Sequence, residues 1–207
     1  MSQSTKAYDK LSLSEYLAKL SSDSPVPGGG SVSAYVASLG MGLTQMVARI
    51  ALNRKPKAGA TPEQKFQHEA NRKRMEEIIS SLEKAKAQAL QVVSLDPQVY
   101  DEVMACYREN AQPEKLEDAL EHAFRLQADL ALIIEMAREW NTHMKGLVQG
   151  AIANDLVVSE RLLAAAFEGA YHTARINVVY MKNQERKARA EQALEELNRR
   201  YQRGRES

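Results

Sequence analysis

The chain has 207 residues, and its 28 lysines and arginines against 27 aspartates and glutamates give a formal net charge of +1. This balance provides no global field for nucleic acid and no polybasic membrane anchor. A single cysteine, Cys106, excludes an internal disulfide and a cysteine-cluster metal site, and it fits a reduced compartment. The first residues lack an apolar signal-peptide core, so we expect a cytoplasmic protein with no membrane or nucleic-acid partner.

The residues between the few prolines and glycines predict helices. Ala, Leu, Glu, Lys and Gln dominate the long intervals, and β-branched runs are scarce. We find no internal repeat and no low-complexity linker. The sequence therefore predicts an all-α fold, a multi-helix bundle forming one domain over residues 1–207, with a core over about 11–181 and a polar helical tail over 182–207.

The first predicted helix follows Ser12. The segment "SLSE", from Ser12 to Glu15, has the spacing of a capping box. We expect the helix to turn Tyr16, Leu17 and Leu20 toward the core and to end at "SSDSPVP".

The segment "PVPGGGS", residues 25–31, needs a physical reason for three consecutive glycines. Gly28, Gly29 and Gly30 can adopt positive φ and let a backbone or ligand approach closely. Ser31 is expected to cap a helix that begins at the next residue, with the positive end of the helix dipole facing the loop. This geometry suits an anionic or carbonyl group, and the competing interpretation is a tight turn that sets a helix angle.

The helix expected from residue 32 onward carries apolar residues at helical spacing, with small residues between them. Small residues permit a close helix crossing, and polar residues are few before Gln45, so we expect this helix to be central and buried on most sides. The apolar set is Val32, Tyr35, Val36, Leu39, Leu43, Met46, Val47 and Ile50.

A long helix is expected from Pro62 to about Ser94. Pro97 disfavours helix at Asp96 and suits the first turn of a following helix, which predicts Asp96 as a helix cap. Two more long helices are expected at about 114–144 and 155–181. The polar tail after them is either solvated or packed on a partner subunit.

Polar residues in the last long helix have two interpretations. Asn154 and Asp155 stand at its start, and His172 and Asn177 lie in an otherwise apolar stretch. Buried polar groups need partners, which are either an internal hydrogen-bond network or a ligand. No histidine follows a glutamate at the spacing of a helical di-metal site, so no metal centre is expected.

Three segments together resemble the cyclodeaminase/cyclohydrolase family, which comprises the C-terminal domain of formiminotransferase-cyclodeaminase and free-standing relatives. They are "PVPGGGSVSAYVASLGMGLTQMVARI", "LDPQVYDEVM" and "NDLVVSERLLAAAFEGAYHTARIN". The likeness spans most of residues 11–181, and Pro27 to Ser31 match the family's Pro-Gly-Gly-Gly-Ser loop fully. The resemblance implies an all-helical homodimer that takes a tetrahydrofolate derivative as substrate and holds no permanently bound cofactor.

The family's Ser-Asp appears here as Asn154-Asp155 without the Gly-Asn pair that usually precedes it, and two further departures bear on activity. Ser94 replaces the first acid of an Asp-x-Asp run, in which Asp96 matches the second, and Thr173 replaces the first Asn of a closing motif, in which Asn177 matches the last. Two hypotheses therefore stay open. The chain is either a folate enzyme, cyclodeaminase or cyclohydrolase, or a non-catalytic folate-binding or assembly paralogue.

The resemblance implies ring closure of 5-formiminotetrahydrofolate with loss of ammonia, or hydrolysis of 5,10-methenyltetrahydrofolate to 10-formyltetrahydrofolate. Both reactions pass through a tetrahedral carbon between N5 and N10, where a positioned carboxylate can move a proton. Asp96 is the expected general base and acid, and Asp155 and Asn177 would orient the pterin or the attacking group. The expected substrate-binding residues are Pro27, Gly28, Gly29, Gly30, Ser31, Asn154, His172 and Asn177.

Basic residues around the start of the long helix are candidate contacts for a polyglutamate tail on the folate. They are Lys55, Lys57, Arg72, Lys73 and Arg74. A charge run of this kind is more often a solvated face.

Overall fold

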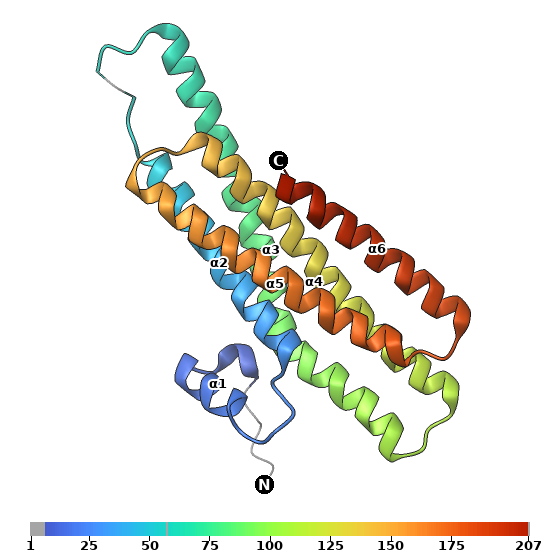
Figure 1. Ribbon diagram of the computed structural model, residues 1–207. Helices are drawn as coiled ribbons and strands as arrows, with labels where there is room; N and C mark the ends of the chain where they lie inside the picture. Colours follow the sequence, from blue (N-terminus) through green and yellow to red (C-terminus); the bar gives the residue numbers. More distant parts are fainter. Residues whose placement is uncertain (1–6, 57, 207) are drawn as a thin grey trace.

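The computed structural model describes residues 7–56 and 58–206, and within these ranges the chain forms helices and no strand. Two are short 3₁₀ helices and six are α-helices (Figure 1). In chain order they are η1 (Tyr8–Lys10), α1 (Leu13–Leu20), α2 (Gly29–Leu52), α3 (Pro62–Arg108), α4 (Pro113–Leu147), η2 (Ala151–Ala153), α5 (Asn154–Tyr180) and α6 (Gln184–Glu206).

Four long helices, α2 to α5, lie side by side as a bundle. Helix α2 packs mainly on α3 and α5, and α4 packs on the same two helices. Helix α6 runs along α4 and α5, and α1 lies beside the start of α2 (Figure 1). The predicted all-α bundle is confirmed.

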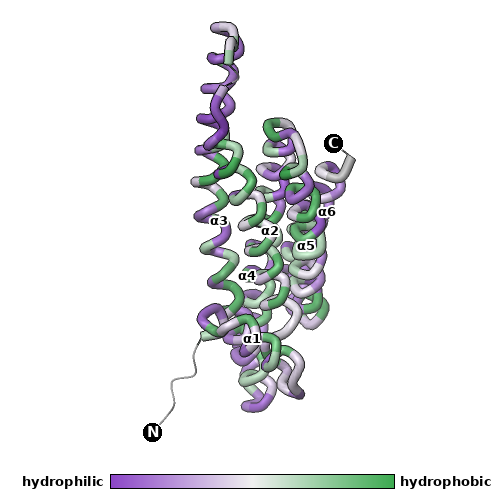
Figure 2. Tube along the Cα trace, turned by 90° about the vertical axis from the view of Figure 1, so that its left-hand side faces the viewer, coloured by the Kyte–Doolittle hydropathy of each residue, from purple (hydrophilic) through white to green (hydrophobic). Residues whose placement is uncertain are grey.

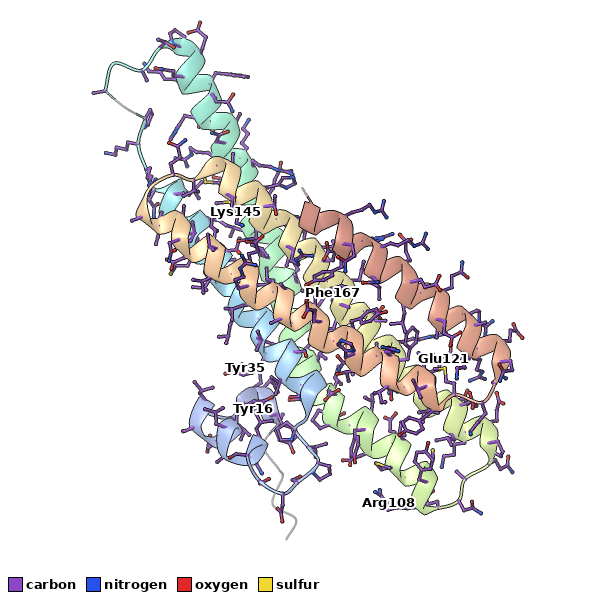
Figure 3. All side chains as sticks on the ribbon, in the orientation of Figure 1. Tyr16, Tyr35, Arg108, Glu121, Lys145 and Phe167 are labelled. Atoms are coloured by element: carbon purple, nitrogen blue, oxygen red, sulfur yellow. The ribbon has the colours of Figure 1, made fainter. Side chains whose placement is uncertain are left out.

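Helix α1 begins as the sequence predicts. The Ser12 hydroxyl accepts from the Glu15 backbone N–H, and the Glu15 carboxylate accepts from the Ser12 backbone N–H, which completes the capping box. Tyr16 is buried and its ring stacks on Tyr35 of α2 with centroids 5.1 Å apart (Figure 3). Leu17 is 50% exposed, so its predicted place in the core is wrong, because this two-turn helix packs on one narrow face only.

Helix α2 begins earlier than predicted. Gly28 is its N-cap and Gly29 its first residue, so Ser31 lies inside the first turn and is not the cap. Gly28 to Gly30 also lack the positive φ that was expected, which among the described glycines is found at Gly59 and Gly150. Gly29 and Gly30 therefore belong to the first turn of α2 and do not form a loop before it.

The small residues of α2 form its packed face. A Cβ at Gly40 would lie 2.9 Å from Leu163 Cγ of α5, and a Cβ at Gly169 of α5 would lie 2.2 Å from Ser33 Oγ of α2. The predicted close crossing is confirmed, because any larger residue at these glycines would push the two helices apart.

Helix α2 is buried over most of its surface, as expected, and Met41 and Val47 are fully enclosed, but three large apolar residues lie on an exposed outer face. Leu39, Met46 and Ile50 are 52%, 39% and 43% exposed. Close packing favours small residues where α2 crosses its neighbours, which leaves these three large residues on the side that no helix of the same chain covers. By length and composition α2 is also the one described helix that could cross a bilayer, and half of its most apolar window is buried in the bundle.

Helix α3 is continuous where a break was predicted. Thr61 caps it, and Pro97 lies inside it. A proline has no N–H for the carbonyl four residues earlier, which here is that of Val93. The Ser31 hydroxyl donates to this Val93 oxygen at 2.8 Å and so replaces the missing donor. The interpretation of Asp96 as the cap of a new helix is therefore wrong.

The first turns of α3 project beyond the other helices and are hydrophilic (Figure 2). Arg72 forms ion pairs with Glu69 and Glu76 of the same helix, and Phe66 is 77% exposed. This part of the chain has the solvated face that its charge run suggested.

Helix α6 packs on the bundle, so the tail is neither freely solvated nor outside the core. The Tyr201 ring stacks on Phe167 of α5 with centroids 4.2 Å apart, and the Arg138 guanidinium of α4 lies 4.4 Å from the Tyr201 centroid. The buried residues of α6 are Ala190, Leu194, Leu197 and Tyr201. Packed residues thus extend past the core boundary predicted at residue 181.

Candidate functional site

A cavity of about 720 Å³ lies where the start of α2 meets α3, α4 and α5. Its wall comes from the last third of α3, the first third of α4 and the end of α5. Most of the wall is apolar or aromatic, including Val99, Tyr100, Val103, Met104, Leu120 and Ile176. Such a cavity suits a ligand with a flat, largely apolar body and a few polar groups.

Asp96 is the one carboxylate among the described residues that line this cavity. Its side chain is held at both oxygens, since Oδ2 accepts from the Ser31 backbone N–H at 2.9 Å and Oδ1 accepts from Gln127 Nε2 at 2.7 Å. Burial raises the pKa of Asp96, and these two hydrogen bonds partly oppose the rise. The group is thus a fixed carboxyl with increased proton affinity.

Gly30 makes room for this carboxylate. A Cβ at Gly30 would lie 2.1 Å from Asp96 Oδ1 and 2.2 Å from Gln127 Nε2. Either distance is far inside van der Waals contact, so both side chains would have to move. Gly30 thus lets the Asp96 side chain lie directly against the first turn of α2, and this close approach is the reason for a glycine at this position.

Ser31 links α1, α2 and α3 beneath Asp96. Its hydroxyl lies 2.9 Å from the Tyr16 hydroxyl of α1 and donates to Val93 of α3, which leaves Tyr16 as the donor to Ser31. Burial raises the pKa of Tyr16, so the phenol stays protonated and can donate. Ser31 does not line the cavity, and its contribution is to hold the segment that does.

Sequence reasoning missed Gln127, which touches Asp96 from α4. Its side chain is 1% exposed, and its Oε1 is buried without a partner in the described part of the chain. The signal that could have found it is a polar residue on an apolar helix face, between Leu126 and Ala128.

Two further polar side chains line the cavity from α5. Thr173 donates from Oγ1 to the Gly169 carbonyl, and Asn177 donates from Nδ2 to the Thr173 carbonyl, both at 2.9 Å. These bonds fix the amide of Asn177 and leave its Oδ1 as an acceptor for a ligand. Gly28 and Gly29 line the same region, and a Cβ at Gly29 would lie 3.7 Å from Thr173 Oγ1.

Of the residues predicted for the site, Asp96, Gly28, Gly29, Gly30 and Asn177 line one cavity. Besides Ser31, four others do not. Pro27 is buried behind the loop, after a cis peptide bond, and His172 is exposed on α5 with its ring edge on Tyr171. Asn154 and Asp155 stand at the start of α5, eighteen or more residues before Thr173, which is about 27 Å along the helix. Within one chain they are remote from Asp96.

Ser94 points away from the cavity. Its hydroxyl donates to Asp9 Oδ1 at 2.6 Å and accepts from the Asp9 backbone N–H at 3.0 Å. The bond from Ser94 is the main cause that lowers the pKa of Asp9, so this carboxylate is ionised. The N-terminal segment thus places the Asp9 carboxylate next to Ser94, which is the position where the family usually has an acid.

The basic residues proposed for a polyglutamate tail lie far from this cavity. Arg72 precedes Asp96 by 24 residues on the same continuous helix, which is about 36 Å. Lys55 lies in the connection before α3, and Lys57 lies outside the described residues. Arg74 is paired with Glu77.

The sequence profile of the family described as formiminotransferase-cyclodeaminase matches residues 12–196. Among curated proteins, none matches the chain. Among solved structures, the crystal structure of formiminotetrahydrofolate cyclodeaminase from Thermotoga maritima matches with a TM-score of 0.82 and 22% sequence identity, and the match covers 96% of each chain. At this identity the structural likeness shows a shared fold.

Proposed function

Because the chain belongs to the formiminotransferase-cyclodeaminase family, we propose that it is an enzyme of folate one-carbon metabolism that acts on the one-carbon unit between N5 and N10 of a tetrahydrofolate derivative. The observation that carries this proposal is the buried Asp96 carboxyl in the wall of a large apolar cavity, beside the start of α2. The substrate is the tetrahydrofolate derivative itself, and no permanently bound cofactor takes part. The proposed location is the cytoplasm.

In the cyclodeaminase reaction, N10 attacks the formimino carbon and ammonia leaves. Asp96 takes the proton that N10 loses and gives it to the departing amino group, so one carboxyl serves as base and then as acid. Its raised pKa suits this exchange, since a group that protonates closer to neutral pH passes through both states more readily. The proton balance closes without another titrating group when the formimino group binds as its amidinium cation, because its NH₂ group and the N10 proton together supply the three hydrogens of ammonia.

In the cyclohydrolase reaction, water attacks the same carbon of 5,10-methenyltetrahydrofolate. Asp96 takes a proton from this water and returns it to N5 as the bond between carbon and N5 breaks, and the second proton of the water passes to solvent as the carbonyl of the 10-formyl product forms. The same position of the carboxyl serves both reactions, because both form a tetrahedral carbon between the two nitrogens.

The start of α2 and the end of α5 supply the polar contacts for the substrate in this proposal. The backbone N–H groups of Gly29 and Gly30 belong to the first turn, where helical amides have no partner inside the helix. They can donate to a pterin carbonyl, and Asn177 Oδ1 can accept from a pterin amine. Shape and dispersion contacts with the apolar wall hold the rest of the ring system.

Product analysis tests the proposal. The purified chain is incubated with each of the two substrates, and release of ammonia is measured separately from loss of methenyl absorbance. Turnover of one substrate, strongly reduced in Asp96→Asn, supports the enzyme and assigns the reaction. Tight binding of tetrahydrofolate derivatives without turnover of either substrate favours the non-catalytic paralogue, to which Ser94 and Thr173 point. If no tetrahydrofolate derivative binds, the folate function is wrong.

We also propose that the chain forms a homodimer through the outer face of α2. The outward residues repeat at alternating steps of four and three, which is the 3.5-residue period of a helix that packs along another helix. They are Val32, Val36, Leu39, Leu43, Met46 and Ile50, named here the α2 seam. A continuous apolar stripe of this length is unusual on a monomer, and a second copy presents the same stripe for pairing.

A further inference from the structure

The cavity carries opposite charges at its two ends. Asp96 is its one acidic lining residue among those described, and Lys182 is its one basic lining residue. Between them the wall is apolar apart from tyrosine hydroxyls and the α5 polar groups already described. A ligand that fills the cavity therefore lies between an acidic residue at one end and a basic residue at the other.

Two hydrogen bonds that involve α4 locate these ends. At one end Gln127 donates to Asp96, and at the other the Lys182 backbone N–H donates to Glu117 Oε1 at 2.6 Å. Gln127 and Glu117 are ten residues apart on α4, which is about 15 Å along the helix. Helix α3 gives a similar span, since Tyr107 lines the cavity eleven residues after Asp96.

The connection between α5 and α6 fixes Lys182 but leaves its charge available. Met181 before it is buried, and the backbone bond to Glu117 anchors the residue itself. Arg186, the next cation along the chain, is already paired with Glu114, Asp118 and Glu121. The Lys182 ammonium has no ion-pair partner in the described part of the chain.

Glu117 does not compete for this ammonium from inside the cavity. Its side chain is 4% exposed and is absent from the cavity wall. The far end of the cavity is thus suited to an anion.

We propose that Lys182 binds the glutamate carboxylate of the substrate, an inference that rests on the folate function proposed above. With N5 and N10 at Asp96, the aminobenzoyl group extends along the apolar wall and the glutamate reaches the opposite end. The structure thereby orients the substrate, with its reacting carbon at the start of α2 and its anionic end at the start of α6. This assignment replaces the remote basic residues of α3 as the anchor.

The test compares two ligands that differ by the glutamate alone. Binding of 5-formyltetrahydrofolate and of the methylamide of 5-formyltetrahydropteroate, in which a neutral methylamide replaces the glutamate, is measured by calorimetry for the wild type and for Lys182→Met. We expect Lys182→Met to weaken binding of the folate about tenfold and to leave binding of the pteroate methylamide unchanged. The matched control is Lys187→Met, a half-exposed lysine of α6 that does not line the cavity.

Each outcome separates this inference from the function on which it rests. Equal effects of Lys182→Met on both ligands, or no effect on either, overturn the role of Lys182 while the folate function stands. The role of Lys182 is also overturned if Lys187→Met weakens binding of the folate as much as Lys182→Met does. Loss of any positive charge near the cavity would then explain both results. If the wild type binds neither ligand, both proposals are wrong.

Discussion

The Asp96 carboxylate of α3 accepts a hydrogen bond from the backbone N–H of Ser31 in the first turn of α2, across 65 residues of sequence. One residue of α3 thus caps another helix, while the hydroxyl of Ser31 in return supplies the donor that Pro97 removes from α3. The two helices complete each other's backbone hydrogen bonding at the wall of the cavity. This exchange places a titrating carboxyl where a helix start and an apolar cavity meet.

Replacement of Asp96 by Asn separates the structural role from the chemical one. The oxygen of the new side-chain amide still accepts from Ser31, and a rotated Gln127 amide can accept from the new NH₂ group. We expect thermal stability to change by less than about 1 kcal/mol and turnover to fall roughly 10²-fold or more. Differential scanning calorimetry and steady-state kinetics measure the two effects. Normal turnover of the variant would assign the proton transfer to another group.

The same substitution predicts a pH dependence of stability. Burial raises the pKa of Asp96 above the ordinary value of 3.8, so the folded state binds this proton more tightly than the unfolded state does. Ionisation therefore lowers the free energy of unfolding of the wild type as pH rises from the ordinary pKa through the raised one. Asp96→Asn has no titrating group at this position, so its free energy of unfolding does not fall for this reason. In urea unfolding at a series of pH values, the stability of the variant minus that of the wild type should increase with pH. A decrease would show that the hydrogen bonds outweigh burial.

Gln127→Leu should shift the pH–rate profile. The Gln127 amide donates to the ionised Asp96, and a hydrogen bond to a charged group contributes about 1.5–3 kcal/mol. Its loss favours the protonated carboxyl, so the acidic limb of kcat/KM should move about one to two pH units upward. Gln45→Leu is the control, since Gln45 is equally buried and bonds to Glu83 away from the cavity. An unshifted limb for Gln127→Leu would leave this residue a packing role only.

Gly30→Ala should destroy the site by adding one methyl group. That methyl would overlap Asp96 Oδ1 and Gln127 Nε2, so we expect loss of turnover and a decrease in stability of about 1–3 kcal/mol. Gly42→Ala on the same helix meets open space and should stabilise by about 0.5–1 kcal/mol. Thermal melting and kinetics of the pair give the comparison. Full activity of Gly30→Ala would contradict the described position of Asp96.

Leu39→Glu should convert the proposed dimer into a monomer. Leu39 is at the middle of the α2 seam and 52% exposed in a single chain, so a carboxylate there is tolerated by the monomer and repelled by its copy in the partner. Sedimentation velocity measures the change. Phe66→Glu, at an exposed residue on the projecting part of α3, is the control and should stay dimeric. A monomeric wild type, or a wild type that instead binds lipid vesicles through this face, would refute the dimer.

The sequence was sufficient for features that depend on local spacing. The capping box of α1, the helical composition and the close crossing at Gly40 all follow from residues a few positions apart. The glycine run also pointed to a close approach, although its conformation was predicted wrongly. Because any residue can adopt the helical φ found here, the backbone does not require a glycine at Gly30. The requirement comes from the side chain of Asp96 on α3, which occupies the space that a Cβ would need.

Features that depend on distant partners could not be read from the sequence. Pro97 predicts a break because the compensating donor, Ser31, stands 62 residues before the Val93 carbonyl that it serves. Gln127 has no motif and gains meaning only through its contact with Asp96. The outward turn of Leu39 follows from which face of α2 the neighbouring helices choose, and periodicity marks both faces of this helix as apolar.

The position of α2 along the chain has a consequence for synthesis on the ribosome. Most of this helix is apolar, and its main neighbours, α3 and α5, emerge after it, the second about a hundred residues later. Before α5 is made, the nascent chain exposes both the small-residue face of α2 and the α2 seam. Exposed apolar surfaces of this kind are prone to aggregation. We therefore expect the segment from Gly29 to Leu52 to need protection, by a chaperone or by rapid docking of α3, until the last third of the chain has been made.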